Sequence, residues 1–280
     1  MTVGKMTDVD ANGPDSTVLD RAESVAIALA REAGLMIRDR LEDERAITHK
    51  GAVDLVTDAD HASEVIVAGG LSKAFPDHRL IGEEGSRGSE SSPYGWVIDP
   101  LDGTTNYAHR YPHFAVSIAL EFKGAPVLGV VYDPMRNELF HAKLGSGAFV
   151  NDRPIHVSET TDLIQSLLAS GFSYVIAERE TSFALWKEIN NTAQGVRRDG
   201  AAALDMCYVA AGRLDGYYER PVNAWDIGAG AIIVLEAGGR LSSLEGATFG
   251  LYDREVTATN GKIHDELVGQ ILRTLGHPAG

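Results

Sequence analysis

Apolar residues recur at helical spacing in two stretches of the first quarter of the chain. In the first, over residues 16 to about 41, they fall on one face of a helix, and Asp15 or Ser16 stands where an N-cap would. In the second, over residues 58–75, the pattern stops at Pro76. The spacing therefore predicts two helices before the first long strand.

Short apolar runs separated by turn residues follow and predict strands. These runs cover residues 79–81, 95–98, 115–120, 127–132 and 138–141. The last three are joined by connections too short for a crossover helix, so they predict an antiparallel meander. A loop and a hairpin are expected next, over residues 145–154.

Helices and strands alternate in the second half of the chain. Strands are expected at residues 167–170, 215–219 and 256–258, and helices at 177–192, 201–212, 224–237 and 263–275. The helix at 224–237 runs into two consecutive glycines, a strong stop signal. With no linker or repeat, this order predicts an α/β fold in which layers of helix and sheet form two closely apposed halves.

Composition and charge narrow the class of protein. The chain has 280 residues, of which 44% are hydrophobic and 23% charged, values typical of a globular protein and not of a disordered one. A single cysteine, Cys207, excludes a disulfide framework and is expected in the core. No apolar run is long enough to span a membrane. A cytoplasmic protein is expected, with a flexible tail over residues 1–15 and one domain over residues 16–280.

The net charge of −15 bears on the partners of the chain. It argues against direct binding to nucleic acid or to an anionic membrane surface, because both would be repelled. An acidic protein that acts on an anionic small molecule needs a positive group between the two, and a divalent metal ion commonly supplies it.

The segment WVIDPLDGTTN, residues 96–106, is the strongest candidate for chemistry. An apolar strand ends at Asp99, Pro100 keeps Asp99 extended, and Asp102 follows close enough for the two carboxylates to converge. The next residues, Gly103 and Thr104, open a short helix whose free N–H groups suit a phosphate. This arrangement predicts a Mg²⁺-assisted phosphoryl site. The same dipeptides are also typical of an ordinary β-turn.

Three further acidic elements are weak when each is taken alone. Glu83 ends an apolar strand, an acidic run that includes Asp60 begins a helix, and Asp226 follows Trp225 at the start of a helix rich in small residues. Acidic residues favour helix N-termini and solvent in any protein, so each element also has an ordinary structural explanation. The small residues of the last helix permit close packing.

Together these motifs resemble the inositol monophosphatase family, a group of Mg²⁺-dependent, typically lithium-sensitive sugar and polyol phosphatases. The resemblance rests on DPLDGTTN, the upstream IGEE and the downstream WD, and it covers residues 16–275 in matching order. It implies a layered αβαβα sandwich of the inositol monophosphatase and fructose-1,6-bisphosphatase type. A metal-site half would cover residues about 16–155 and a substrate-lining half residues about 156–280, and the protein would be a homodimer.

The resemblance also implies an all-oxygen ligand set for roughly two or three Mg²⁺ ions per active site. The implied ligands are Glu83, Asp99, the main-chain carbonyl of Leu101, Asp102 and Asp226.

Catalytic roles are implied for Asp60, Thr104 and Glu83. Asp60 and Thr104 match the pair that orients and deprotonates the attacking water, while the N–H groups of Gly103 and Thr104 would hold the phosphate. The implied reaction is in-line attack of a metal-activated water on phosphorus, without a phosphorylated enzyme.

Substrate contacts are implied for a set of residues from both halves. They are Asp102, Gly103, Thr104, Arg197, Gly200, Ala201, Ala202, Glu219 and Asp226. Ala201 stands where a serine or threonine is frequent in the family, which removes a hydroxyl contact and puts inositol specificity in doubt. The histidines show no zinc-site spacing, and His109 and His113 are not expected to share a metal because Pro112 separates them.

The function implied is hydrolysis of inositol monophosphate to inositol and phosphate. The alternatives of the same chemistry are a fructose-1,6-bisphosphatase, a histidinol-phosphatase, a 3′-phosphoadenosine 5′-phosphate phosphatase or another small sugar or polyol phosphatase. The alternative of a different class is a regulatory protein that keeps the fold without catalysis.

Overall fold

The structure is a computed structural model that describes residues 13–43, 47–49, 55–83, 85–89, 91–173 and 175–276. The first twelve residues of the tail expected at 1–15 lie outside this part, and Asp15 at its end caps the first helix by accepting from Thr17 N at 2.8 Å. The helices are α1 (Ser16–Asp39), α2 (Asp58–Ala74), α3 (Thr104–Ala108), α4 (Arg179–Asn190), α5 (Ala202–Ala210), α6 (Ala224–Glu236) and α7 (His264–Thr274). Two 3₁₀ turns lie at Leu163–Gln165 and Ile176–Glu178.

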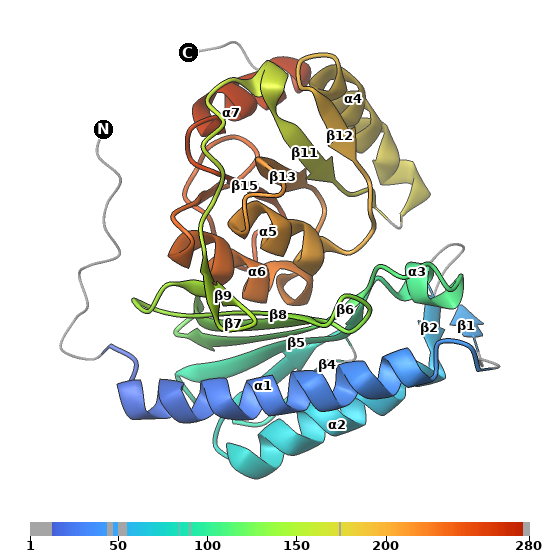
Figure 1. Cartoon of the computed structure of the whole chain (residues 1–280), viewed down its shortest axis with the longest axis vertical. Helices are drawn as coiled ribbons and strands as arrows, with labels where there is room; N and C mark the ends of the chain where they lie inside the picture. The colour runs from blue at the N-terminus through green and yellow to red at the C-terminus, as the bar shows by residue number, and fades with distance from the viewer. Residues whose placement is uncertain are drawn as a thin grey trace.

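Helices and sheets stack in five layers, as Figure 1 shows. The helices α1 and α2 cover the outer face of a large sheet, and α5 and α6 lie between this sheet and a smaller one. The helices α4 and α7 cover the far face of the smaller sheet. This αβαβα sandwich confirms the fold class expected from the sequence.

The large sheet has eight strands in the order β10-β9-β8-β7-β6-β5-β3-β4. Its strands are β3 (Arg79–Gly82), β4 (Gly85–Arg87), β5 (Tyr94–Asp102), β6 (Ala115–Phe122), β7 (Ala125–Asp133), β8 (Glu138–Lys143), β9 (Ala148–Val150) and β10 (Arg153–Ile155). The predicted meander is confirmed, because β6, β7 and β8 pair in antiparallel succession. By contrast, β3 runs parallel to β5, so their C-terminal ends meet at one edge.

The smaller sheet has five strands in the order β12-β11-β13-β15-β14. Its strands are β11 (Leu167–Ser170), β12 (Gly195–Arg197), β13 (Gly216–Glu219), β14 (Arg240–Ser242) and β15 (Val256–Thr259). The strand β11 is parallel to both neighbours, whereas β15 runs antiparallel. A separate pair of short strands, β1 (Ile47–His49) and β2 (Leu55–Thr57), precedes α2.

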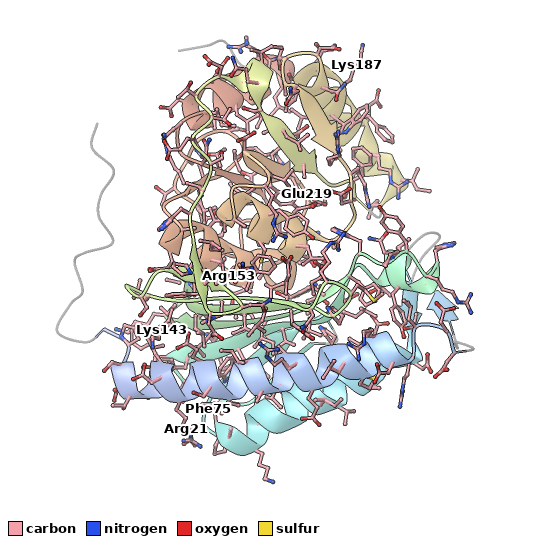
Figure 2. The ribbon with its side chains drawn as sticks, in the orientation of Figure 1. Arg21, Phe75, Lys143, Arg153, Lys187 and Glu219 are labelled. Carbon is pink, nitrogen blue, oxygen red and sulfur yellow. The ribbon has the colours of Figure 1, made fainter. Side chains whose placement is uncertain are left out.

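Three buried apolar clusters hold the layers together. One packs α1 and α2 on the large sheet, one packs α5 and α6 between the two sheets, and one packs α4 and α7 on the smaller sheet. Polar contacts fix α1 at its start, where Lys143 pairs with Glu23 at 3.1 Å and Arg21 lies over the ring of Phe75 at 4.8 Å (Figure 2). Cys207 is buried between the sheets, as expected.

Small residues let α6 approach the large sheet closely. A Cβ atom on Gly129 of β7 would lie 2.4 Å from the carbonyl oxygen of Ala229, and one on Gly228 would lie 3.3 Å from the Cβ of Ala119. The close packing expected for this helix is therefore present. It fixes the position of the N-terminus of α6, which carries Asp226.

The helices of the described residues include none with both the length and the apolar character of a membrane span.

Candidate active site

The strand β5 brings two carboxylates to its C-terminal end. Asp99 and Asp102 are 5% and 6% exposed, and the pairing of β5 with β6 is irregular between them. Pro100 lies in this irregular stretch and donates no N–H to the ladder. The side chain of Asp99 accepts a hydrogen bond from Leu101 N at 3.0 Å. The strand thus holds two acidic groups, three residues apart, against one cleft.

The chain turns at Gly103 to begin α3. Its φ of 89° is left-handed, and a Cβ atom there would come within 2.9 Å of the carbonyl oxygen of His113. Only glycine fits both conditions without strain. The expected short helix after this glycine is present as α3, and Thr104 is its first residue.

Asp60 and Thr104, forty-four positions apart, are in direct contact. The Thr104 hydroxyl lies 2.9 Å from Asp60 Oδ1 and 3.0 Å from the carbonyl oxygen of Leu101. The other oxygen of Asp60 accepts from the N–H and hydroxyl of Thr57 at 2.8 and 2.6 Å, in a capping box that begins α2. Burial raises the pKa of Asp60, and the Thr57 and Thr104 hydrogen bonds oppose that rise. The structure therefore brings together Asp60 and Thr104, the two residues to which the family resemblance assigns proton transfer.

Asp102 also joins the two halves of the molecule. Its two carboxylate oxygens accept hydrogen bonds from Ala202 N at 3.2 Å and Ala203 N at 2.9 Å, at the start of α5. A second bridge runs through Asn106, whose side-chain N–H₂ donates to the carbonyl oxygens of His113 and Asp199, each at 2.8 Å. These bridges span about a hundred positions of sequence, and no local motif signals them.

Two more acidic residues reach the same cleft from other elements. Asp226 lies in the first turn of α6, where its side chain accepts from Asn223 N at 2.7 Å in a second capping box. Glu83 follows β3 and is exposed. The cleft, of about 320 Å³, is lined by Glu83, Asp99, Leu101, Asp102, Gly103, Thr104, Thr105, Phe172, Ser173, Val175, Glu178, Glu219, Pro221, Asn223, Trp225, Asp226 and Arg254. All five expected metal ligands are among these residues.

The carboxylates of the cleft raise one another's pKa values. The pKa of Asp99 is raised well above its usual value by burial first and then by the charges of Asp102, Asp226 and Glu83. Burial, with the charges of Asp102, Glu219 and Glu83, raises the pKa of Asp226. Burial likewise raises the pKa of Asp102 to about 7, although the N–H groups of α5 oppose the rise.

A divalent cation fits this group of side chains. Several carboxylates that cannot all ionise without repulsion become compatible once a cation lies among them. The donor atoms are oxygens only, which is the set that Mg²⁺ prefers. The residues present therefore suit the metal that the sequence implied.

The side of the cleft formed by the smaller sheet carries Glu219. This residue ends β13, accepts a hydrogen bond from the Tyr217 hydroxyl and lies near the middle of the molecule in Figure 2. Burial raises its pKa to about 6, opposed by the Tyr217 hydrogen bond and the charge of Arg198. A smaller adjoining pocket, of about 60 Å³, is lined by Asp102, Ser170, Gly171, Phe172, Arg198, Gly200, Ala201, Ala202, Asp205, Glu219, Val222 and Asp226.

One expected substrate contact is not brought to the cleft. Arg197 ends β12 with its side chain exposed, outside the residues that line either pocket. Its neighbour Arg198 lines the smaller pocket, and its guanidinium lies 5.7 Å from the ring of Phe172. Successive residues at the end of a strand point in opposite directions. Of the two adjacent arginines, Arg198 therefore lies at the pocket and Arg197 does not.

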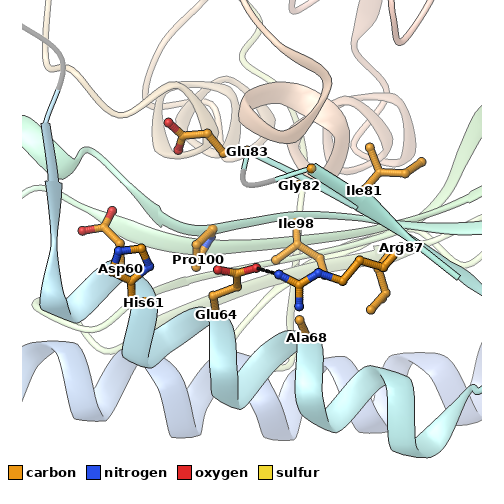
Figure 3. A pocket seen from close by; sticks show the side chains of 12 residues that line it. Asp60, His61, Glu64, Ala68, Ile81, Gly82, Glu83, Arg87, Ile98 and Pro100 are labelled. Carbon is orange, nitrogen blue, oxygen red and sulfur yellow. Dashed lines mark hydrogen bonds and ion pairs between the residues drawn. The ribbon is translucent and has the colours of Figure 1, made fainter. Parts of the chain in front are cut away.

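A narrow cavity of about 30 Å³ lies behind the acidic cleft, between α2 and the edge of the large sheet (Figure 3). An ion pair between Arg87 and Glu64, 3.2 Å long, crosses it. Figure 3 shows the carboxylate of Glu83 directed away from this pair. The cavity walls are mainly apolar, but Asp60 and Glu83 also line it, and Glu83 lines the acidic cleft as well, so the cavity adjoins the site.

The fold is shared with solved structures of inositol monophosphatases. The inositol monophosphatase of Anabaena (Nostoc) sp. PCC 7120 superposes with a TM-score of 0.81 at 41% identity, covering 92% of this chain and 96% of that one. The chain belongs to the inositol monophosphatase family, whose model matches residues 18–277.

Two named relatives show the range of the family. The chain is 47% identical over 231 residues to inositol-1-monophosphatase of Synechocystis sp., covering 81% of this chain and 80% of the relative. It is 43% identical over 252 residues to Nus factor SuhB of Pasteurella multocida, covering 89% and 94% of the two chains. Relatives named as phosphatases support a phosphomonoesterase, and the second name indicates a different role for some members.

Proposed function

We propose that this protein is a Mg²⁺-dependent phosphomonoesterase that hydrolyses inositol monophosphate. The observation that carries the proposal is that Glu83, Asp99, Asp102 and Asp226 line one cleft with Thr104. The Thr104 hydroxyl is in turn hydrogen-bonded to Asp60 at 2.9 Å. The family and the relatives named inositol monophosphatase support the same activity.

The metal would be held by the carboxylates of Glu83, Asp99, Asp102 and Asp226 with the carbonyl oxygen of Leu101. When bound, Mg²⁺ neutralises phosphoryl charge and favours ionisation of water at neutral pH. We infer roughly two or three ions per site from the family resemblance, and several carboxylates in one cleft are compatible with that number.

Asp60 and Thr104 would move the proton of the attacking water. The water lies beside the Thr104 hydroxyl, which passes its own proton to Asp60 Oδ1 as it accepts one from the water. The water oxygen then forms a bond to phosphorus while the bond to the ester oxygen breaks, and the leaving alkoxide takes a proton from solvent. Burial, by raising the pKa of Asp60, makes it a stronger base for this step. No phosphorylated enzyme forms.

The phosphate and the polyol would be held by opposite sides of the cleft. The N–H groups of Gly103 and Thr104, at the start of α3, would hold the phosphate. The carboxylate of Glu219 accepts hydrogen bonds from ring hydroxyls, and the segment from Gly200 to Ala202 borders the same space. Arg198 replaces Arg197 as the basic residue on this side. A polyol phosphate suits such a wall, and a fructose bisphosphate is the first alternative.

The test is phosphate release from four substrates, each with and without Mg²⁺ and each repeated with Li⁺. The substrates are inositol 1-phosphate, fructose 1,6-bisphosphate, histidinol phosphate and 3′-phosphoadenosine 5′-phosphate. We expect Mg²⁺-dependent, lithium-inhibited turnover that is fastest with inositol 1-phosphate. Preference for another substrate would retain the metal site and reject the inositol assignment. Release of no phosphate from any of them would contradict the proposal.

The alternative is a regulatory protein without catalysis. The relative named Nus factor SuhB is the reason for considering it. The acidic cleft favours catalysis. A protein without catalytic activity would have no need to keep four carboxylates that repel one another. A homodimer and a cytoplasmic location stay predictions. Light scattering on the purified protein checks the first, and cell fractionation checks the second.

A further inference from the structure

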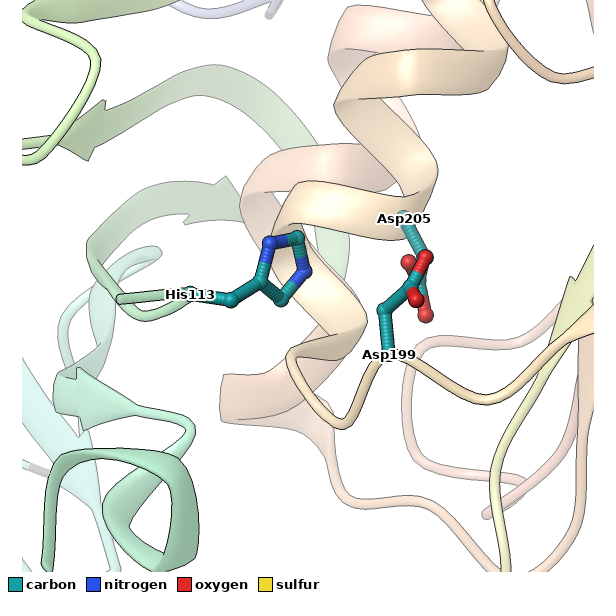
Figure 4. Close-up of side chains that lie close together, drawn as sticks. All are labelled: His113, Asp199 and Asp205. Carbon is teal, nitrogen blue, oxygen red and sulfur yellow. The ribbon is translucent and has the colours of Figure 1, made fainter. Parts of the chain in front are cut away.

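Three ligand-type side chains, none of which lines the acidic cleft, meet beside the smaller pocket. His113 lies in the loop before β6, Asp199 follows β12, and Asp205 lies in the first turn of α5. One ligand atom from each lies within 4.8 Å of those of the other two. Figure 4 shows the imidazole facing the two carboxylates, whose oxygen atoms are gathered together.

Two of these side chains are buried with polar atoms that lack a partner. His113 is 4% and Asp205 2% exposed, and within the described part of the chain neither His113 Nε2 nor Asp205 Oδ1 has a hydrogen-bond partner. An unsatisfied buried polar atom destabilises the folded state, and more so when it is charged. Two such atoms beside one half-buried carboxylate therefore point to a missing partner.

The charges of the group identify that partner as a cation. Burial, followed by the charges of Asp199, Asp102 and Glu219, raises the pKa of Asp205, although the charge of Arg198 opposes the rise. Burial lowers the pKa of His113 despite the nearby Asp199 carboxylate, so its imidazole is neutral near pH 7 and does not supply positive charge. A neutral imidazole is itself a ligand for metal ions.

We propose that His113, Asp199 and Asp205 bind a divalent transition-metal ion at a site separate from the acidic cleft. One nitrogen and two oxygen ligands suit Zn²⁺ or Mn²⁺ better than Mg²⁺, which prefers oxygen alone. Water would complete the coordination, and the ion would enter through the smaller pocket, which Asp205 lines. Ligands on tetrahedral Zn²⁺ are about 3.4 Å apart, so the side chains close in by roughly 1 Å on binding.

This ion would fix the substrate side of the active site. The side-chain N–H₂ of Asn106 already donates hydrogen bonds to the carbonyl oxygens of both His113 and Asp199. The N–H groups at the start of α5 donate to the carboxylate of Asp102. A metal on the same segments would restrain the loop from Asp199 to Ala201 and the first turn of α5. It would do so without touching the phosphate.

The experiment measures bound Zn²⁺ per chain after dialysis of the wild-type protein and of His113→Gln, with His109→Gln as the matched control. His109 is exposed and lies four positions away in the same segment. We expect His113→Gln to bind one equivalent fewer than the wild type and His109→Gln to match the wild type. Equal stoichiometry in all three proteins would overturn the proposal. The residues of the acidic cleft are unchanged in all three proteins. Any Zn²⁺ bound there therefore adds equally to each and does not affect the difference between them.

A second measurement covers the case in which His113→Gln does not fold. X-ray absorption of the Zn²⁺-loaded wild-type protein, with His109→Gln alongside, shows imidazole scattering that a site of oxygen ligands alone cannot give. We expect that scattering in both proteins and its loss in Asp205→Asn, which removes a ligand from another element. Absence of imidazole scattering in the wild type would reject the site whatever the variants do, and whether or not inositol phosphate is hydrolysed.

Discussion

Asp99 illustrates how one residue serves function at the expense of stability. It lies in the acidic cleft, where burial and three neighbouring carboxylates raise its pKa. The ionised carboxylate of such a residue lowers the stability of the folded protein when no cation is bound. It raises the stability when a cation binds beside it. Activity and metal-free stability are therefore expected to respond in opposite directions when its charge is removed.

Replacing Asp99 by asparagine tests whether activity falls while metal-free stability rises. We expect Asp99→Asn to lower kcat by about 10²–10³-fold, the scale of losing one preorganised charge in an active site. In EDTA the same variant should melt at a higher temperature than the wild type, because repulsion within the cleft is relieved. Phosphate release and thermal unfolding provide the two readouts. Asp77→Asn, at an exposed position, should change neither, and near-wild-type turnover by Asp99→Asn would show that the ligand assignment is wrong.

Spacing alone could predict only residues close together in the sequence, whereas the distant pair of Asp60 and Thr104 came from the family resemblance. Asp99 and Asp102 are three positions apart, so one motif revealed both. The bond from Ala202 N to Asp102 crosses 100 positions, and the group of His113, Asp199 and Asp205 depends on the same folding of one half onto the other. Sequence spacing argued against a shared metal between His109 and His113, but it could not reveal partners supplied by another layer.

Among the secondary structure elements, those with a clear periodic pattern were predicted almost to the residue. Examples are α1, α2 and β11. The strand expected at residues 95–98 extends to Asp102, because β6 continues to pair with residues that resemble a turn in isolation. The short strands β12 and β14 were not predicted, since three residues carry little pattern and depend on the neighbouring strand.

The close approach of α6 to β7 predicts the effect of a single methyl group. Gly129→Ala would place Cβ 2.4 Å from the carbonyl oxygen of Ala229, so α6 must shift. We expect a loss of about 1–3 kcal/mol in the free energy of unfolding, the usual range for overpacking. We also expect lower activity, because α6 carries Asp226. Denaturant unfolding and phosphate release measure the two effects.

Gly69→Ala is the matched control for this change. Gly69 lies within α2, and a Cβ atom there has no atom within 4 Å. Alanine at an open helical position is expected to raise stability by up to about 1 kcal/mol. If both variants lost stability equally, close packing of α6 on β7 would not be the reason.

At the scale of the whole molecule, the acidic cleft lies where the two halves meet. The central core includes Val97 and Val131 of the large sheet, Ile227 of α6 and Tyr217 of the smaller sheet, so the halves share one apolar interior. The sequence predicted five layers, but it did not predict which strands are neighbours within a sheet. Parallel pairings such as β3 with β5 bring residues that are distant in sequence to the same edge. The geometry of the cleft therefore depends on the packing of the entire chain.

This arrangement links stability, pH and Mg²⁺ in one prediction. The folded-state pKa of Asp102 is about 7, above its usual 3.8, and those of Asp99 and Asp226 are also raised. The folded protein therefore holds more protons than the unfolded chain between these values. It follows that the contribution of these groups to stability is present at about pH 4 and is lost as the pH rises through about 7.

Mg²⁺ binds the ionised carboxylates, so its stabilising effect should show the opposite trend. We expect a small rise in melting temperature on adding Mg²⁺ at about pH 5 and a rise of several degrees at about pH 8. Melting curves in EDTA and in Mg²⁺ across this range measure the effect. Asp102→Asn should flatten the pH dependence in EDTA, because it removes one of the groups that take up protons. A Mg²⁺ effect independent of pH would mean that protons and the cation do not compete for the same carboxylates, and that the metal binds outside the cleft.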